Sequence, residues 1–207
     1  MARVLSVCVT VMVTLFAATT ETSAQDLIHP EEHFQAPNPA DVDGQEATSI
    51  YAGLAARMID GYALSKDDAA LSYRGWPRYN SSPFRSATHG ERYVNVYANA
   101  RASDYGLFEE AAPLPEGAII AKDSFTVTED GRTYPGPLFV MEKMAEGFDE
   151  RSGDWRYAMI MPDGSFIGES LRANDRSMDF CVECHAAVGA EQDHLFFMPA
   201  DVRVEGP

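Results

Sequence analysis

The chain has 207 residues, of which 45% are hydrophobic and 11% aromatic, so it can form one packed domain with an extension. Its 32 Asp and Glu residues outnumber 16 Lys and Arg residues, and the resulting net charge of −16 argues against partners such as nucleic acid and anionic lipid. The same charge suits either a merely soluble protein or one that docks on a basic partner.

Residues 1–24 have the pattern of a signal peptide. Arg3 is the positive start, an apolar run covers 4–18, and small residues up to Ala24 offer a cleavage site. Because the run is short for a membrane span, we expect cleavage near Ala24 and no span in the mature chain, with an uncleaved anchor as the alternative. Cleavage removes Arg3 and Glu21, so the charge stays at −16.

Residues 25–75 are expected to form an N-terminal arm and a helical segment. The stretch 25–44 is rich in Pro and acidic residues, whereas Gln45–Ala63 repeats apolar residues with the period of an amphipathic helix. A second, short helix is expected to begin around Ser65, with Ser65 as its N-cap.

Residues 76–207 contain the predicted sheet. Alternating and apolar runs are separated by turn signals such as Pro162-Asp163-Gly164. Short turns between neighbouring strands favour antiparallel pairing, so the predicted fold class is α+β with a mostly antiparallel sheet and a few helices. The expected strands are Tyr93–Ala98, Ala118–Thr128, Leu138–Met144, Trp155–Met161 and Ser165–Gly168.

The sequence Cys181-Val182-Glu183-Cys184-His185 is a C-x-x-C-H motif, which is the attachment signature of a c-type haem. On one helical turn the two thiols and the imidazole project from the same side. The alternatives are a zinc half-site and a redox dithiol, but a second pair of zinc ligands and a preceding βαβ unit are both missing. We therefore predict one covalent haem c, with His185 as the iron ligand.

The compartment and the position of the motif narrow this interpretation. Of the three cysteines, Cys8 lies in the signal segment, so the other two are both in the motif and leave none for a structural disulfide. Haem attachment outside the cytoplasm agrees with export, and predicts the periplasm. The motif follows the strands, whereas small electron-transfer cytochromes c carry it near their N-terminus, so the ordinary cytochrome c fold is disfavoured.

Four stretches together resemble the cytochrome P-460 family, which includes the beta-type cytochromes c-prime. They occur in the family's order between residues 76 and 203: His89–Tyr97, Pro115–Lys122, Gly153–Tyr157, and Cys181–His185 followed by Asp193–Phe196.

The resemblance implies a mostly antiparallel sheet, one c-type haem, often a homodimer, and His185 as the proximal ligand opposite an open iron position. In hydroxylamine-oxidising members a lysine is cross-linked to the porphyrin edge, and Lys122 corresponds to it. In the beta-type cytochromes c-prime the cross-link is absent and the pocket binds nitric oxide.

Lys122 has two interpretations from its residues alone. Strand alternation places it beside residues 120 and 124, and a solvated face is the commoner fate of a lysine. A buried lysine would instead lose its proton more readily and become nucleophilic, as a bond to the porphyrin requires.

Arg92 and His89 begin the first of the resembling stretches. Either could act over an open haem face as a cation or a proton-transfer group, or could be a surface arginine and a hydrogen-bonded histidine. The family's distal arginine position falls nearer Val94, which leaves an apolar pocket as another possibility.

Further side chains are weaker candidates. A sixth iron ligand could come from a methionine, although core filling is the commoner role, or from a histidine. Asp193 could instead orient an imidazole such as that of His185. The sixth-ligand candidates are Met141, Met144, Met198 and His194, and the possible proton acceptors are Glu142, Glu146 and Asp149.

Three functions remain open. The first is an oxidoreductase that acts on small nitrogen species, by oxidising hydroxylamine or handling nitric oxide, and passes electrons to another cytochrome. The second is a nitric-oxide-binding protein without turnover. The third is plain electron transfer, which needs a filled sixth position on the iron.

Overall fold

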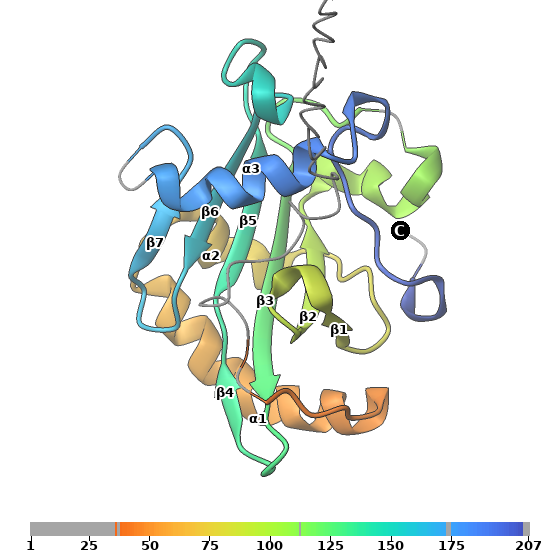
Figure 1. Ribbon diagram of the computed structural model, residues 1–207, viewed down its shortest axis with the longest axis vertical. Coiled ribbons are helices and arrows are strands. Elements are labelled where there is room, and N and C mark those ends of the chain that lie inside the picture. Colours follow the sequence, from red (N-terminus) through yellow and green to blue (C-terminus); the bar gives the residue numbers. More distant parts are fainter. Residues whose placement is uncertain (1–35, 37, 112, 173–174, 205–207) are drawn as a thin grey trace, which may run out of the picture.

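The computed structural model of the chain describes residues 36, 38–111, 113–172 and 175–204, so the predicted signal segment and most of the arm lie outside the described residues. The described part is built on a seven-stranded antiparallel sheet with helices on both faces (Figure 1). The fold is α+β, as the sequence predicts.

The sheet runs in the order β1-β2-β3-β5-β6-β7, and β4 pairs with one end of β3. Each of the five predicted strands is present within one residue at each end. The sequence did not predict β1 and β4, because a three-residue strand has too little alternation to be detected. The strands are β1 (Phe84–Ser86), β2 (Arg92–Ala98), β3 (Ile119–Val127), β4 (Thr133–Pro135), β5 (Leu138–Lys143), β6 (Trp155–Ile160) and β7 (Phe166–Glu169).

The α-helices are α1 (Gly44–Ala63), α2 (Asp68–Ser72) and α3 (Asp179–Ala186). The predicted cap of α2 is wrong. The Asp67 carboxylate accepts the Ala69 and Ala70 amides at 2.9 and 3.1 Å, whereas Ser65 donates to the last turn of α1. Of the helices in the described ranges, none is long and apolar enough to cross a membrane. Short 3-10 helices occupy Tyr73–Gly75, Ala87–His89, Ala100–Glu110, Glu150–Ser152, Asp175–Met178, Ala190–Gln192 and Ala200–Val202.

The alternation along each strand divides the interior into two hydrophobic cores. On one face, Ala121 and Phe125 of β3 pack with Tyr51 and Met58 of α1. On the other face, Ile120 of β3 belongs to the core that includes Val182 of α3 and the C-terminal Leu195 and Met198. In Figure 1, α3 (blue) crosses one face of the sheet and α1 (orange) lies behind the other. The C-x-x-C-H motif is therefore held against a sheet face, which positions the site described next.

A buried polar network lies on the α1 face. Asp123 is fully buried, and its carboxylate accepts hydrogen bonds from Tyr51 Oη at 2.5 Å, Tyr73 Oη at 3.2 Å and Asn95 Nδ2 at 3.0 Å. Arg74, at the edge of this network, donates to Tyr51 Oη at 2.7 Å. Burial raises the pKa of the Asp123 carboxyl, so the surrounding donors are needed to keep this group in the interior.

Candidate haem pocket

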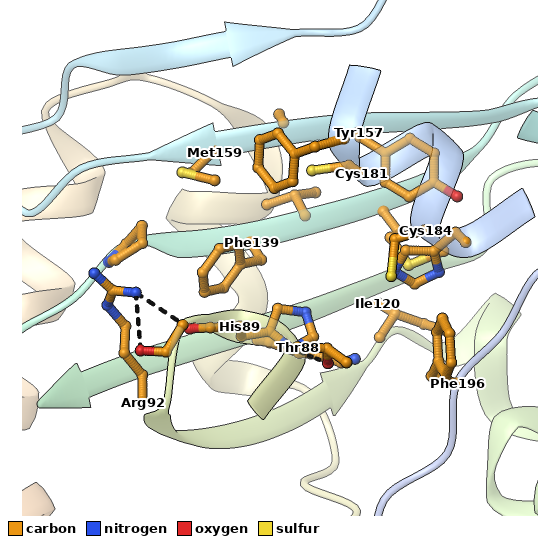
Figure 2. A pocket seen from close by; sticks show the side chains of 18 residues that line it. Thr88, His89, Arg92, Ile120, Phe139, Tyr157, Met159, Cys181, Cys184 and Phe196 are labelled. Carbon is orange, nitrogen blue, oxygen red and sulfur yellow. Dashed lines mark hydrogen bonds between the residues drawn. The ribbon is translucent and has the colours of Figure 1, made fainter. Parts of the chain in front are cut away.

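The pocket lies between α3 and the sheet (Figure 2). Its lining is mostly apolar, and part of the space between its walls is open to solvent. Strands β3, β5 and β6 form its wall on the sheet side. Their register aligns six pocket side chains in two adjacent rows across the sheet: Ile120–Met141–Tyr157 and Lys122–Phe139–Met159.

Helix α3 supplies the two thiols and the imidazole of the motif. Cys181, Cys184 and His185 all line the pocket, as expected for side chains on one helical turn. Both cysteines are free, and burial raises the pKa of the Cys181 thiol to about 12. Val182 of the same helix points into the core and fixes α3 on the sheet. The pocket therefore receives the whole C-x-x-C-H triad from one rigid element.

His185 is held in one orientation by its ring nitrogen Nδ1. This nitrogen lies 2.7 Å from the carbonyl oxygen of His194, so Nδ1 carries the proton and donates it. Burial lowers the pKa of His185 to about 3, which keeps the imidazole neutral and leaves the lone pair on Nε2. A neutral histidine with Nδ1 bonded to a carbonyl is the form that ligates a metal through Nε2. The orienting acceptor is a backbone carbonyl, whereas the Asp193 carboxylate pairs with Lys143.

Lys122 enters the pocket from β3. Its side chain is buried, at 8% exposure, so the interpretation that places it on a solvated face is wrong. Burial lowers the pKa of its ammonium to about 8, while the nearby Cys184 acts in the opposite direction. A substantial fraction of this amine is therefore neutral and nucleophilic at mildly alkaline pH.

His89 faces the pocket from the loop between β1 and β2. Its Nδ1 lies 2.8 Å from Ser86 Oγ and 3.3 Å from Thr88 Oγ1, and its ring packs edge-on against Phe139 at 4.8 Å between centroids. Burial lowers its pKa well below the usual value, so the imidazole is neutral. His89 is thus a fixed, neutral imidazole inside the pocket.

Arg92 also lines the pocket but is directed to its rim (Figure 2). Its Nη1 donates to the carbonyl oxygens of His89 at 3.2 Å and Gly90 at 3.5 Å. Burial lowers the pKa of the guanidinium. Through these contacts Arg92 stabilises the loop that carries His89.

A model of the family described as Cytochrome P460 matches residues 71–197, which is more than half of the chain. The chain belongs to the cytochrome P460 family. The matched range contains the sheet, the His89 loop, Lys122 and the C-x-x-C-H motif. Membership of a cytochrome family implies that the chain is a haem protein.

The pocket fits a haem. Paired thiols and a metal-ready imidazole lie together on α3, and apolar side chains such as Phe139 form most of the opposite wall. The buried hydroxyl of Tyr157 has no hydrogen-bond partner among the described residues, and its ring lies 5.2 Å from that of His185. An amphipathic cofactor with a flat apolar body matches this arrangement.

Most of the predicted sixth-ligand candidates of this cytochrome P460 family member lie outside the pocket. Met141 lines the pocket, whereas the described lining does not include Met144, Met198 or His194. Met198 is core, and the His194 ring packs beside Gly153.

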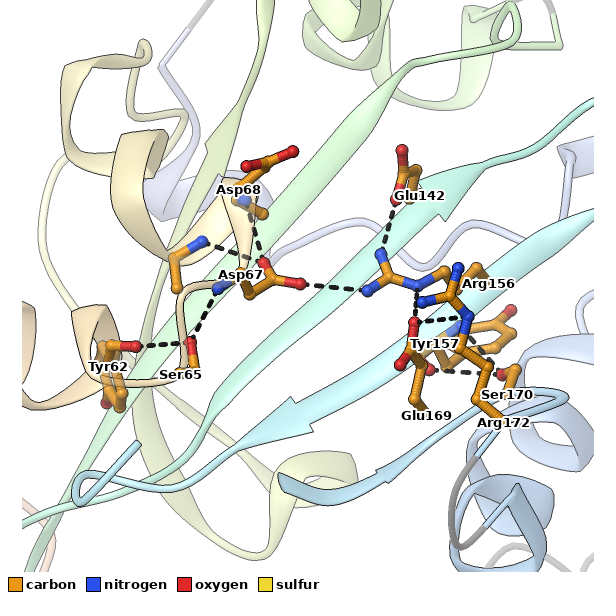
Figure 3. A network of polar contacts seen from close by, with 12 residues as sticks. Tyr62, Ser65, Asp67, Asp68, Glu142, Arg156, Tyr157, Glu169, Ser170 and Arg172 are labelled. Atoms are coloured by element: carbon orange, nitrogen blue, oxygen red, sulfur yellow. Dashed lines mark hydrogen bonds and ion pairs between the residues drawn. The ribbon is translucent and has the colours of Figure 1, made fainter. Parts of the chain in front are cut away.

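Two of the predicted proton acceptors are engaged elsewhere. Glu142 binds Arg156 at 2.6 Å on the opposite face of the sheet (Figure 3), and Asp149 binds Arg151 at 3.0 Å. Glu146 is exposed and does not line the pocket as described. Across the described ranges, no cluster of three or more His, Cys, Asp or Glu side chains is arranged to hold a metal ion.

Several pocket residues were not predicted: Phe139, Tyr157, Met159, Phe180 and Thr88. Alternation shows which residues of one strand share a face, but not which face meets the pocket. The membership of Phe139, Tyr157 and Met159 depends on the register between β3, β5 and β6, which has no local sequence signal. Val94, where the family's distal arginine was expected, is fully buried and is not among these lining residues.

Proposed function

We propose that the chain is an exported c-type cytochrome that oxidises hydroxylamine at a single covalently bound haem. One observation supports this most strongly. The C-x-x-C-H side chains of α3 line the same pocket as His89, Lys122 and Arg92, which come from distant parts of the chain. A haem-attachment motif, a proton-transfer group and a buried amine are therefore brought to one cavity.

Cys181 and Cys184 would hold the haem by thioethers, and His185 would bind the iron through Nε2. The bound haem would supply an iron that takes the substrate nitrogen and passes its electrons to a redox partner. The protein's part is to keep His185 neutral and oriented, to exclude bulk water with apolar walls, and to manage the protons released by oxidation.

His89 is the proposed proton acceptor. When its Nδ1–H donates to Ser86 Oγ, its Nε2 carries the lone pair that can accept a proton. Arg92 would keep the His89 loop in place. The family resemblance makes Lys122 the residue that would be joined to the porphyrin edge, and its buried amine with a lowered pKa is compatible with that role.

Nitric-oxide binding without turnover is the second candidate function. The apolar side chains Phe139 and Met159 in the Lys122 row favour a small neutral ligand, and they offer no charge to a developing anion. Plain electron transfer would instead require a side chain in the sixth position.

The location and partners are part of the same proposal. The signal pattern of residues 1–24 supports export to the periplasm. The net charge of −16 supports docking on a basic redox partner, such as another cytochrome. A homodimer is proposed from the family resemblance.

The test uses the full chain exported from cells that perform c-type haem maturation. A denaturing gel stained for haem should show a covalent band, and the Cys181→Ala/Cys184→Ala variant should show none while Cys8→Ser keeps it. A colourless wild-type band would overturn the proposal.

The purified holoprotein then separates the candidate functions. Turnover of hydroxylamine with an artificial electron acceptor supports the oxidase. Nitric-oxide binding without turnover supports the second candidate. A low-spin six-coordinate spectrum unchanged by either ligand leaves electron transfer alone.

A further inference from the structure

We propose that the ion pair between Lys143 and Asp193 positions the proximal histidine, by holding the turn whose carbonyl accepts the hydrogen bond from His185. This inference rests on the proposed function, in which His185 binds the haem iron. It assigns a role in tuning the iron to residues that lie outside the pocket.

Asp193 is fixed from three directions. Its Oδ1 lies 2.5 Å from Lys143 Nζ, and its Oδ2 accepts the Leu114 amide at 2.8 Å. Its own carbonyl oxygen accepts the indole N–H of Trp155 at 2.9 Å. The two side chains of the ion pair are 15% and 8% exposed, so solvent screens the attraction little. These contacts restrict the backbone conformation at Asp193.

The turn held by these contacts has an uncommon backbone. Asp193 and His194 both have positive φ angles, 49° and 58°. Residues other than glycine adopt this backbone conformation only at a cost in conformational energy. The His194 amide donates to the carbonyl of Gly189 at 3.0 Å. Two consecutive left-handed residues persist where surrounding contacts fix them, and the ion pair is one of those contacts.

Lys143 joins this turn to the loop before β6. Its Nζ also donates to the carbonyl of Gly153 at 2.8 Å, and the ammonium lies 5.1 Å from the centroid of the Trp155 ring. A Cβ on Gly153 would lie only 2.4 Å from Cδ2 of His194, so the loop and the turn are in close contact. One lysine therefore bonds both segments, the loop at Gly153 and the turn at Asp193.

The carbonyl of His194 connects the turn to the proximal histidine. It accepts Nδ1–H of His185 at 2.7 Å. A strong hydrogen bond at Nδ1 increases the electron donation of Nε2 to a metal and lowers the reduction potential of an iron centre. Loosening the turn should lengthen this bond and raise the potential.

The experiment compares holoprotein variants Asp193→Asn, Lys143→Met and Lys143→Arg with wild type and with the exposed control Asp201→Asn. The reduction potential is measured by spectroelectrochemistry, and the iron–histidine stretching frequency of the ferrous form by resonance Raman spectroscopy. We expect Asp193→Asn and Lys143→Met both to raise the potential and lower the stretching frequency. Lys143→Arg, which keeps the charge, should remain near wild type, and Asp201→Asn should leave the frequency unchanged.

A through-space charge effect gives a different pattern. Loss of the Asp193 charge would raise the potential and loss of the Lys143 charge would lower it, with the stretching frequency unchanged in both. That pattern, or no change in either variant, would overturn the inference. If Asp193→Asn does not fold, the two Lys143 variants decide it alone. Absence of covalent haem from wild type would instead refute the proposed function.

Discussion

Lys122 and Asp123 are consecutive residues of β3 whose side chains enter opposite faces of the sheet. Lys122 lies in the largely apolar pocket beneath α3, whereas Asp123 lies at 0% exposure among the hydrogen-bond donors of the α1 face. A single strand thus places one buried ionisable group on each face of the sheet. The acid is provided with partners by the protein, and the base faces a cavity suited to a cofactor.

Replacing Lys122 by Met should separate haem attachment from haem cross-linking. The two thiols of α3 are untouched, so the variant should still stain for covalent haem. Tryptic mass spectrometry should join the Lys122 peptide to the haem peptide in wild type, and the red-shifted, broadened Soret band of that species should be lost in Lys122→Met. The exposed Lys66→Met variant should keep both signatures. Recovery of cleaved, unmodified Lys122 from wild type would remove the cross-link.

Replacing His89 by Phe should remove proton transfer without removing haem. The variant loses the imidazole that Ser86 and Thr88 hold beside Phe139, so hydroxylamine turnover should fall by about 10²-fold or more. Affinity for nitric oxide, which needs no proton acceptor, should change little. Turnover within about twofold of wild type would assign proton transfer to another group.

The pocket was predictable where its signal is local. Cys181, Cys184 and His185 are close in sequence and were identified from their spacing, and the long strands followed from alternation. Phe139, Tyr157 and Met159 were not predicted as pocket residues, because only the register of three strands brings them together. The burial of Lys122 was undecided for the same physical reason, since alternation does not say which face is covered.

The polar candidate residues differ in their location for reasons that lie outside their own sequence neighbourhood. Glu142 and His89 have equally reactive side chains, but Glu142 belongs to the ion cluster around Arg156 on the α1 face and His89 to the pocket. Arg156 also binds Asp67 and Glu169, so residues from three separate elements decide where Glu142 points. Tertiary contacts between distant residues determine such placements, and no short sequence pattern reports them.

Asp123→Asn should destabilise the fold. An amide has one acceptor oxygen, so it cannot accept from Tyr51, Tyr73 and Asn95 together, and each buried donor left unpaired costs about 1–3 kcal/mol. Urea unfolding of the two proteins at the same pH gives the difference. Asp60→Asn, at an exposed position of α1, should be within about 0.5 kcal/mol of wild type.

The comparison of wild type with Asp123→Asn should also depend on pH. Because burial raises the folded-state pKa of Asp123 above its unfolded value, the native state binds the proton more tightly. This contribution to stability is present below the unfolded pKa and is lost as the pH rises through the folded pKa. The stability difference between wild type and Asp123→Asn should therefore shrink as the pH rises through that range. A difference that grows with pH would contradict the raised pKa.

Two glycines of α1 should respond to alanine with opposite signs. A Cβ at Gly61 would clash with the carbonyl oxygen of Pro162, in the turn between β6 and β7, so Gly61→Ala must push α1 away from this turn. We expect a loss of about 1–3 kcal/mol, as for other overpacked sites. At Gly53 a Cβ would meet nothing within 4 Å, and Gly53→Ala should gain about 0.5–1 kcal/mol from helix propensity. Urea unfolding of both variants measures the contrast, and a Gly61→Ala protein as stable as wild type would show that α1 does not approach the turn so closely.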